Sequence, residues 1–275
     1  RVMLARSSET ALGHRLWAWC APGAVCATVV LAVGSVAPVA SAAPDPPRRS
    51  YYVYVAAESD DEVSIVRYGP GGAEVVKTIT VGSFPAEVEG PHGLRVDPDG
   101  RHWYVSMAHG FPYGSVHKYE TETDEWVGDV TLGLFPATLD VSPSTGLLYA
   151  VNFNLHGDHV PSSVSVVFAP VMEEITQIET CIMPHGSRVS SDGKRHYSTC
   201  MMSDQLVESS VVDMRVERRM VLTGGKEQVI PADRSSASMD MASGEICKPT
   251  WVLLSPDDTH IYVPCNGRGD VLEID

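Results

Sequence analysis

The sequence predicts an all-β fold built from a repeated unit of about four strands, and three observations support this prediction. A proline precedes a tyrosine by 13 residues at four places along the chain. Turn-forming residues lie between each such pair and are flanked by short alternating or apolar runs, which is typical of a β-hairpin. No long amphipathic helix is expected after residue 50. The four pairs are Pro91/Tyr104, Pro136/Tyr149, Pro184/Tyr197 and Pro249/Tyr262.

Each predicted hairpin is followed by further strands that complete the unit. Runs rich in valine and isoleucine follow the tyrosine strand, and residue types of this kind suit a pleated, half-buried surface. Residues 51–81 supply three strands of a first unit, and 270–275 supply a third strand of the last one. The third strand is expected at 63–66, 116–119, 164–167 and 271–274, and the fourth at 75–79, 127–132 and 175–178.

The spacing of the repeat tyrosines is that of propeller blades. The successive intervals from Tyr54 to Tyr262 are 50, 45, 48 and 65 residues, close to the period of four-stranded blades. The predicted fold class is therefore an all-β propeller of four-stranded blades, of which this sequence covers about four to five. The longest interval contains an insertion at 223–248, which we expect to be either a lid over the channel or a disordered loop.

The blade motif resembles the YVTN-type β-propeller repeat, a family that includes lactonase-like and nitrous-oxide-reductase-like propellers. The motif is P-x-x-x-x-x-(S/D)-P-D-G-x-x-x-Y-V, and it is clearest around 103–106 and 261–266. The resemblance covers roughly residues 51–275 and implies a propeller that closes with seven blades. We therefore expect the 51–275 propeller to be truncated at its C-terminus. Because propellers host many unrelated activities, the resemblance alone assigns no function.

The N-terminal residues have the pattern of a secretory signal. Arg1, Arg6 and Arg15 precede an apolar run at 16–39 that ends in the small residues of 40–42. We expect a signal peptide at 1–42, a linker at 43–50 and a periplasmic or secreted protein with no membrane span after cleavage. The apolar run is long for a signal, so an uncleaved anchor is the alternative.

Composition and charge exclude several classes of protein. Of the 275 residues, 44% are hydrophobic and 20% are charged, which is typical of a globular chain. The 20 Lys and Arg residues against 35 Asp and Glu residues leave a net charge of −15, which excludes nucleic acid as the main partner because phosphate binding requires a basic surface. The sequence also has no G-x-S-x-G elbow, Walker loop, H-E-x-x-H motif or C-x-x-C-H haem attachment.

Five histidines are predicted to converge on one rim of the propeller. His92 and His185 lie at the start of innermost strands, at equivalent positions of two blades. The loops that follow second strands end at the same rim, and they carry the other three: His109, His156 and His159. Several imidazoles pointing at one spot in an oxidising compartment suit copper or zinc. The alternative is that these histidines only bond neighbouring blades or cap loops.

Two further resemblances bear on these histidines. Their placement resembles that in nitrous oxide reductase, whose copper cluster is bound by histidines at blade tops, and in the copper-dependent methanethiol oxidases. The Pro-His-Gly-x-x-V-x-(P/S)-D-G pattern also resembles lactonase-like propellers related to 6-phosphogluconolactonase, which would make His92 and His185 contacts for a sugar or lactone. A phosphosugar is the less favoured substrate, because a strongly acidic chain offers few basic side chains to bind its phosphate.

Four cysteines follow the predicted signal, and they form two pairs in the repeat. Cys181 with Cys200, and Cys247 with Cys265, lie near the top of one hairpin each, so two intrablade disulfides are expected in an exported protein. The alternative is a soft ligand set beside His185 that would favour copper(I). Its members would be Met183, Cys200, Met201 and Met202.

The function expected from the sequence is that of an exported propeller that binds a small molecule or a protein through its top face and central channel. The first alternative is a copper-dependent periplasmic oxidoreductase with the five histidines as ligands. The second alternative is a lactonase-like hydrolase.

Overall fold

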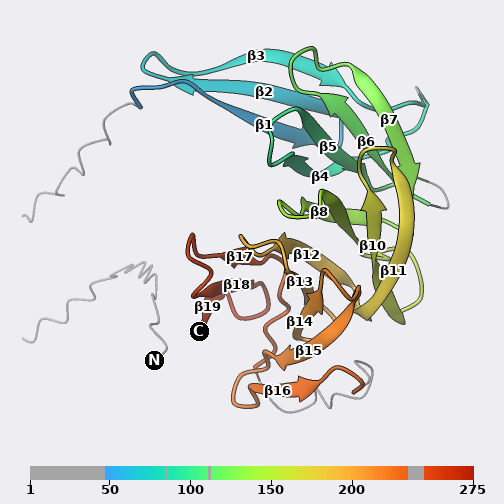
Figure 1. Ribbon diagram of the computed structural model, residues 1–275, viewed down its shortest axis with the longest axis vertical. Coiled ribbons are helices and arrows are strands. Elements are labelled where there is room, and N and C mark those ends of the chain that lie inside the picture. The colour runs from blue at the N-terminus through green and yellow to red at the C-terminus, as the bar shows by residue number, and fades with distance from the viewer. Residues whose placement is uncertain (1–46, 85, 111–112, 235–244) are drawn as a thin grey trace, which may run out of the picture.

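The protein is a five-bladed β-propeller in which the blades follow one another around an arc (Figure 1). The computed structural model describes residues 47–84, 86–110, 113–234 and 245–275. All regular structure in these ranges is β-strand, in five antiparallel sheets. The expected signal peptide at 1–42 and the first part of the linker lie outside the described residues. Within the described ranges no helix has the length and apolar character needed to cross a membrane.

Each sheet is one blade, and its strands are consecutive in the chain. Blade 1 contains β1 (Tyr51–Ala57), β2 (Glu62–Gly69) and β3 (Gly72–Thr80). Blade 2 contains β4 (Pro91–Val96), β5 (His102–Met107), β6 (Ser115–Glu120) and β7 (Trp126–Thr131). Blade 3 contains β8 (Pro136–Val141), β9 (Leu147–Asn152), β10 (Pro161–Phe168) and β11 (Glu173–Ile182). Blade 4 contains β12 (Pro184–Val189), β13 (Arg195–Cys200), β14 (Gln205–Ser210), β15 (Arg215–Val221) and β16 (Gln228–Pro231). Blade 5 contains β17 (Leu253–Leu254), β18 (Ile261–Cys265) and β19 (Asp270–Ile274).

The predicted all-β propeller is confirmed, and the expected third and fourth strands coincide with strands of the structure, except that β7 ends at Thr131, one residue before the expected end. Blades 2 and 3 have the four strands of the repeat, and blade 1 has three, as expected from 51–81. Blade 4 differs because part of the 223–248 insertion forms β16, which pairs with β15 as a fifth strand. The expectation of a lid or disordered loop there concerns 235–244 as well, and those residues lie outside the described ranges.

The turn between the first two strands of a blade has a left-handed residue, which explains why the repeat has glycine there. Gly100, Gly146 and Gly193 occupy this turn in blades 2, 3 and 4, with φ of 73°, 68° and 70°. Glycine adopts this left-handed conformation without a steric penalty. Blade 5 has Asp258 in the corresponding turn at φ 54°, and aspartate is one of the few other residues that tolerates it.

The hydrophobic cores lie between neighbouring blades rather than within single sheets. One core joins blades 1 and 2, where Trp103 stacks on Tyr119 at 4.1 Å between ring centroids and contacts Tyr54 of blade 1 at 5.4 Å. Other cores join blades 2 with 3, 3 with 4, and 4 with 5. The repeat residues Tyr104 and Tyr149 are buried in these layers. The blades are therefore held as one body, with their first strands toward the inside of the arc (Figure 1).

Candidate functional site

Two histidines begin the innermost strands of blades 2 and 4. His92 and His185 each follow the proline that opens β4 and β12. The strand pairing is interrupted just after each proline, between Pro91 and Leu94 and between Pro184 and Ser187. Such bulges re-aim side chains at strand ends, so both imidazoles are turned toward the inside of the arc.

The residue after each histidine is glycine because the inner strand of the next blade leaves no room for a side chain there. A Cβ on Gly93 would lie 2.2 Å from the carbonyl oxygen of Ala137, the first strand of blade 3. The backbone N–H of Gly93 donates to Ser106 Oγ at 2.8 Å, and this hydroxyl donates to the same Ala137 oxygen at 2.6 Å. The Pro-His-Gly pattern thus brings neighbouring inner strands close and fixes the direction of the histidine.

Blade 4 repeats this arrangement against blade 5. The backbone N–H of Gly186 donates to Thr199 Oγ1 at 2.8 Å, and Thr199 donates to the carbonyl of Thr250 at 3.0 Å. Blade 3, between the two histidine blades, has Ala137 at the equivalent position. Its short side chain leaves room for His92 and His185 to meet although their blades are not adjacent.

The Nε2 atoms of His92 and His185 face each other at 3.4 Å. Nδ1 of His185 lies 2.9 Å from the carbonyl oxygen of Thr250, which only accepts, so this nitrogen carries the proton. Nδ1 of His92 lies 3.2 Å from Oε1 of Glu58. A carboxylate also accepts, which places the proton of His92 on Nδ1 as well. In their neutral forms both histidines therefore present unprotonated Nε2 atoms to each other.

The ionisation of the site leaves a free lone pair on each of the two facing Nε2 atoms. Burial, together with the nearby His92, lowers the pKa of His185 to about 4, so His185 is neutral at pH 7. Partial burial would raise the pKa of Glu58, but its contacts with His109 and His92 outweigh burial and lower it. Two lone pairs beside an ionised carboxylate repel each other unless a proton or a metal cation lies between them.

The spacing of the two nitrogens fits a tetrahedral metal ion. Metal–nitrogen bonds of about 2.0–2.1 Å at a tetrahedral angle separate two ligand nitrogens by about 3.3 Å, and the observed separation is 3.4 Å. The Nδ1 contacts with Glu58 and Thr250 are those that orient metal-binding histidines in proteins. His92 and His185 could therefore hold copper or zinc through Nε2.

Larger groups of possible metal ligands lie away from the histidine pair. Groups of three or more side chains whose possible ligand atoms all lie within 4.8 Å occur elsewhere in the described ranges. The histidine site thus offers a pair of nitrogens rather than a closed set of three. The two groups are Asp97, Asp99 and His102, and His260, Glu273 and Asp275.

Two more of the five predicted histidines lie beside the pair. His109 donates to Glu58 Oε1 through Nε2 at 2.8 Å, and its ring centroid lies 5.8 Å from that of His156. Glu58 thus links His92 to His109. His159 is exposed, and within the described ranges no ring contact or ion pair joins it to the other four. The structure gathers His92, His109, His156 and His185 and leaves His159 at the periphery.

Sequence reasoning missed the carboxylate and the aromatic side chains of the site. Glu58 follows the tyrosine strand of blade 1, in the loop that corresponds to the one carrying His109 in blade 2, so alignment of the blades could have found it. Phe135 packs edge-on against His92 and His109. Phe153 and Trp251 pack edge-on against His185, with 5.0 and 5.2 Å between ring centroids. These rings exclude water from one side of the histidines.

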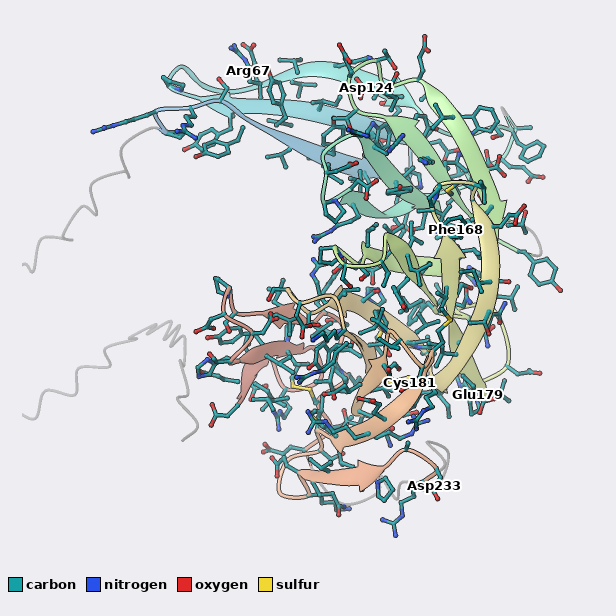
Figure 2. All side chains as sticks on the ribbon, viewed as in Figure 1. Arg67, Asp124, Phe168, Glu179, Cys181 and Asp233 are labelled. Carbon is teal, nitrogen blue, oxygen red and sulfur yellow. A yellow bond between two sulfur atoms is a disulfide. The ribbon has the colours of Figure 1, made fainter. Side chains whose placement is uncertain are left out.

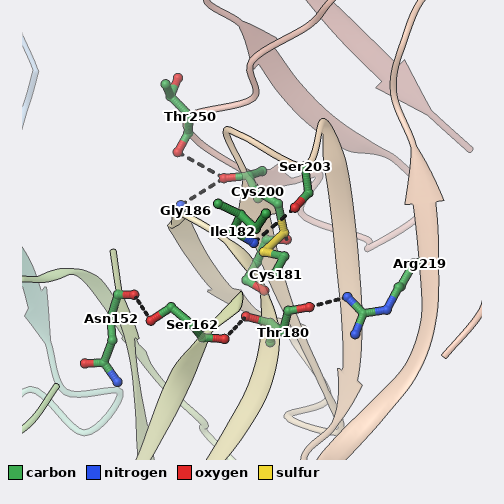
Figure 3. The surroundings of a disulfide bond; sticks show 12 residues. Asn152, Ser162, Thr180, Cys181, Ile182, Gly186, Cys200, Ser203, Arg219 and Thr250 are labelled. Carbon is green, nitrogen blue, oxygen red and sulfur yellow. Dashed lines mark hydrogen bonds between the residues drawn. A yellow bond between two sulfur atoms is a disulfide. The ribbon is translucent and has the colours of Figure 1, made fainter. Parts of the chain in front are cut away.

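The predicted cysteine pairs are present as two disulfides, Cys181–Cys200 and Cys247–Cys265. Figure 3 shows the first one, beside which Ser203 accepts a hydrogen bond from the backbone N–H of Ile182 at 3.0 Å. An oxidised Cys200 offers no thiolate, which removes the thiolate ligand from the soft copper(I) set. The methionines of that set pack in the core between blades 3 and 4: Met183, Met201 and Met202.

Comparison with known proteins supports the fold. The chain is similar to hydrazine synthase of Kuenenia stuttgartiensis, with 16% identity and a TM-score of 0.55, over 88% of this chain and 79% of that chain. It is also similar to a protein of unknown function from Desulfotomaculum acetoxidans DSM 771, with 10% identity and a TM-score of 0.57, over 82% of this chain and 65% of that chain. No protein-family model and no curated protein matches the sequence. At these identities the similarity extends to the fold, and the chain is a β-propeller.

Proposed function

We propose that this protein is an exported ligand-binding propeller whose inner rim binds a transition metal ion, copper in the first place, through Nε2 of His92 and His185. The observation that carries the proposal is the pair of facing Nε2 atoms at 3.4 Å, each left unprotonated because its Nδ1 faces an acceptor. Imidazole suits both copper and zinc, and copper(II) binds more tightly than zinc to a given nitrogen site.

The neighbours of the pair have separate roles in this proposal. Glu58 accepts from His92 and supplies a negative charge that offsets the charge of the cation. Thr250 holds the ring of His185 through its carbonyl oxygen. His109 lies on the other side of Glu58 and holds that carboxylate through its Nε2. The two disulfides support the export part of the proposal, because disulfides persist in oxidising compartments.

Calorimetric titration of the metal-free protein with copper(II) tests the proposal. Asparagine is the useful replacement for both histidines, because its side-chain N–H can replace the Nδ1 donor while the Nε2 ligand is lost. His92→Asn and His185→Asn should each weaken copper binding at least tenfold, and Glu58→Gln should weaken it about 10- to 100-fold through the loss of the carboxylate partner. His159→Asn is the matched control on the same rim and should bind copper as the unchanged protein does.

Unchanged copper affinity in His185→Asn would contradict the proposal, provided that the variant melts at a temperature close to that of the unchanged protein. Tighter binding of zinc than of copper would support the same histidine site with zinc as its metal. Binding that persists in both histidine variants would assign the heat of binding to other surface groups.

A copper-dependent oxidoreductase is the second candidate, and the small number of protein ligands favours it. Two protein ligands leave coordination positions open, which is the condition for a catalytic rather than a structural metal. Reduction and reoxidation of the bound copper, followed by absorption or electron paramagnetic resonance, would test this candidate. Turnover of a panel of lactones by the metal-free protein would instead support a lactonase-like hydrolase.

A further inference from the structure

A polar cavity of about 530 Å³ lies on the flank of blade 2, away from the first strands. It is lined by the connection from β3 to β4, the connection from β5 to β6, and the outer strands β6 and β7. A second cavity of about 470 Å³ adjoins it and shares Ser83, His117 and Trp126 with it. The two cavities together form a groove between blades 1 and 2.

Carboxylates dominate the charge of this cavity. Glu87, Glu89 and Asp129 line it, and among its described lining residues there is no lysine or arginine. Glu89 is buried, and its Oε2 accepts hydrogen bonds from the backbone N–H groups of Ser83 and Phe84. Glu87 and Asp129 have no ion-pair partner within the part of the chain that the structure describes. The cavity is therefore negatively charged and selects against anions.

The acidic residue of the adjoining cavity is already neutralised. Asp124, labelled in Figure 2, lies 2.8 Å from Nζ of Lys77 on β3. That ion pair links β3 of blade 1 to the turn that follows β6 in blade 2. The uncompensated charge thus lies with Glu87, Glu89 and Asp129.

Three exposed aromatic side chains surround the carboxylates. The exposed fractions of Phe84, Tyr113 and Trp126 are 63%, 57% and 56%, and all three line the cavity. Large aromatic side chains are costly to leave in water, and their ring faces attract cations. An acidic cavity with three available rings has the composition of a site for an organic cation.

A buried histidine in the cavity lacks one hydrogen bond. His117 lines the cavity and is 6% exposed, and its Nδ1 has no partner within the described residues. Burial lowers the pKa of His117, although Asp129 and Glu89 act in the opposite direction. A buried ring nitrogen without a partner is costly in either tautomer, so the protein leaves a polar group of this cavity unsatisfied.

We propose that this cavity binds an alkylammonium ion, with its carboxylates as charge partners and its aromatic rings against the alkyl chain, beside the unpartnered imidazole of His117. The ammonium group can belong to a free amine or to a lysine side chain of a partner protein. The site is separate from the histidine pair and does not depend on a bound metal.

Isothermal titration of the purified protein with n-butylammonium chloride is the direct test. We expect saturable binding of n-butylammonium and none of n-butanol, the neutral analogue of similar size. Trp126→Leu and Asp129→Asn should each weaken binding about two- to fivefold, the range of an exposed cation–ring or charge contact. A parallel titration with acetyl-Gly-Lys-Gly-amide separates the two sources, because stronger binding of this peptide than of the free amine indicates a lysine of a partner.

Two exposed positions outside the cavity supply matched controls. Phe168→Leu on β10 removes an exposed aromatic ring and Glu122→Gln in the turn after β6 removes an exposed carboxylate, and both should leave the affinity unchanged. Thermal unfolding of every variant checks that the fold is retained. Equal binding of n-butanol and n-butylammonium, no saturable binding of either cation, or full affinity in both cavity variants would overturn the proposal.

Discussion

His196 should make the stability of the propeller depend steeply on pH. This side chain is fully buried in β13, where its ring stacks on Tyr149 at 4.9 Å and its Nε2 lies 2.8 Å from Ser187 Oγ. Burial lowers the pKa of His196 from 6.5 to about 3. The folded protein therefore keeps His196 neutral at pH 5, whereas the unfolded chain protonates it. Because the unfolded state binds more protons, stability falls as pH falls below 6.5.

The loss of stability at pH 5 depends mainly on the pKa of His196 in the unfolded chain. Relative to pH 7, protonation of the unfolded chain at pH 5 lowers the free energy of unfolding by about 2 kcal/mol for one such histidine. Urea unfolding of the unchanged protein and of His196→Gln at both pH values measures it. The unchanged protein should lose about 2 kcal/mol more than the variant over this interval.

The comparison uses the change with pH, so a general loss of stability in His196→Gln does not affect it. His159→Gln, at an exposed position, is the control and should follow the unchanged protein. Equal losses in the unchanged protein and in His196→Gln would refute the conclusion that buried His196 stays neutral.

Two further predictions concern the disulfides and the inner strands. Replacing Cys181 and Cys200 together by alanine opens a link with a sequence separation of 19 and should lower the free energy of unfolding in urea by about 3 kcal/mol; an unchanged midpoint would contradict this. Gly93→Ala places a methyl group 2.2 Å from the Ala137 oxygen and should cost about 1–3 kcal/mol of stability and weaken copper binding by displacing the preceding histidine. Gly71→Ala, where a Cβ meets nothing within 4 Å, should leave both quantities unchanged.

Much of the fold could be predicted because each blade repeats the same local signals. The turn glycines Gly100, Gly146 and Gly193 mark the hairpins, and the Pro–Tyr spacing marks the first two strands of each blade. The two disulfides followed from the same register. The fifth strand of blade 4 could not be predicted, because β16 has only four residues and forms by pairing with the edge of β15.

The candidate site could be predicted only in part, because contacts between blades depend on side chains far apart in the sequence. The repeat register placed His92 and His185 at equivalent positions, and the structure brings their Nε2 atoms together. The role of Glu58 was missed because it lies in an acidic run that resembles a solvated loop. The pairing of Nδ1 of His185 with Thr250, 65 residues away, has no local signal in the sequence. That contact decides which nitrogen of the ring is free.

Elemental analysis of the protein most directly tests the central claim that His92 and His185 bind a metal ion. The full chain would be expressed with export to the periplasm in a host grown with copper and zinc, and metal would be measured by inductively coupled plasma mass spectrometry. We expect about one copper ion per chain in the unchanged protein and in His159→Asn, and no copper above background in the double variant His92→Asn, His185→Asn. Protein that carries no metal, or a folded double variant that retains it, would contradict metal binding by this pair.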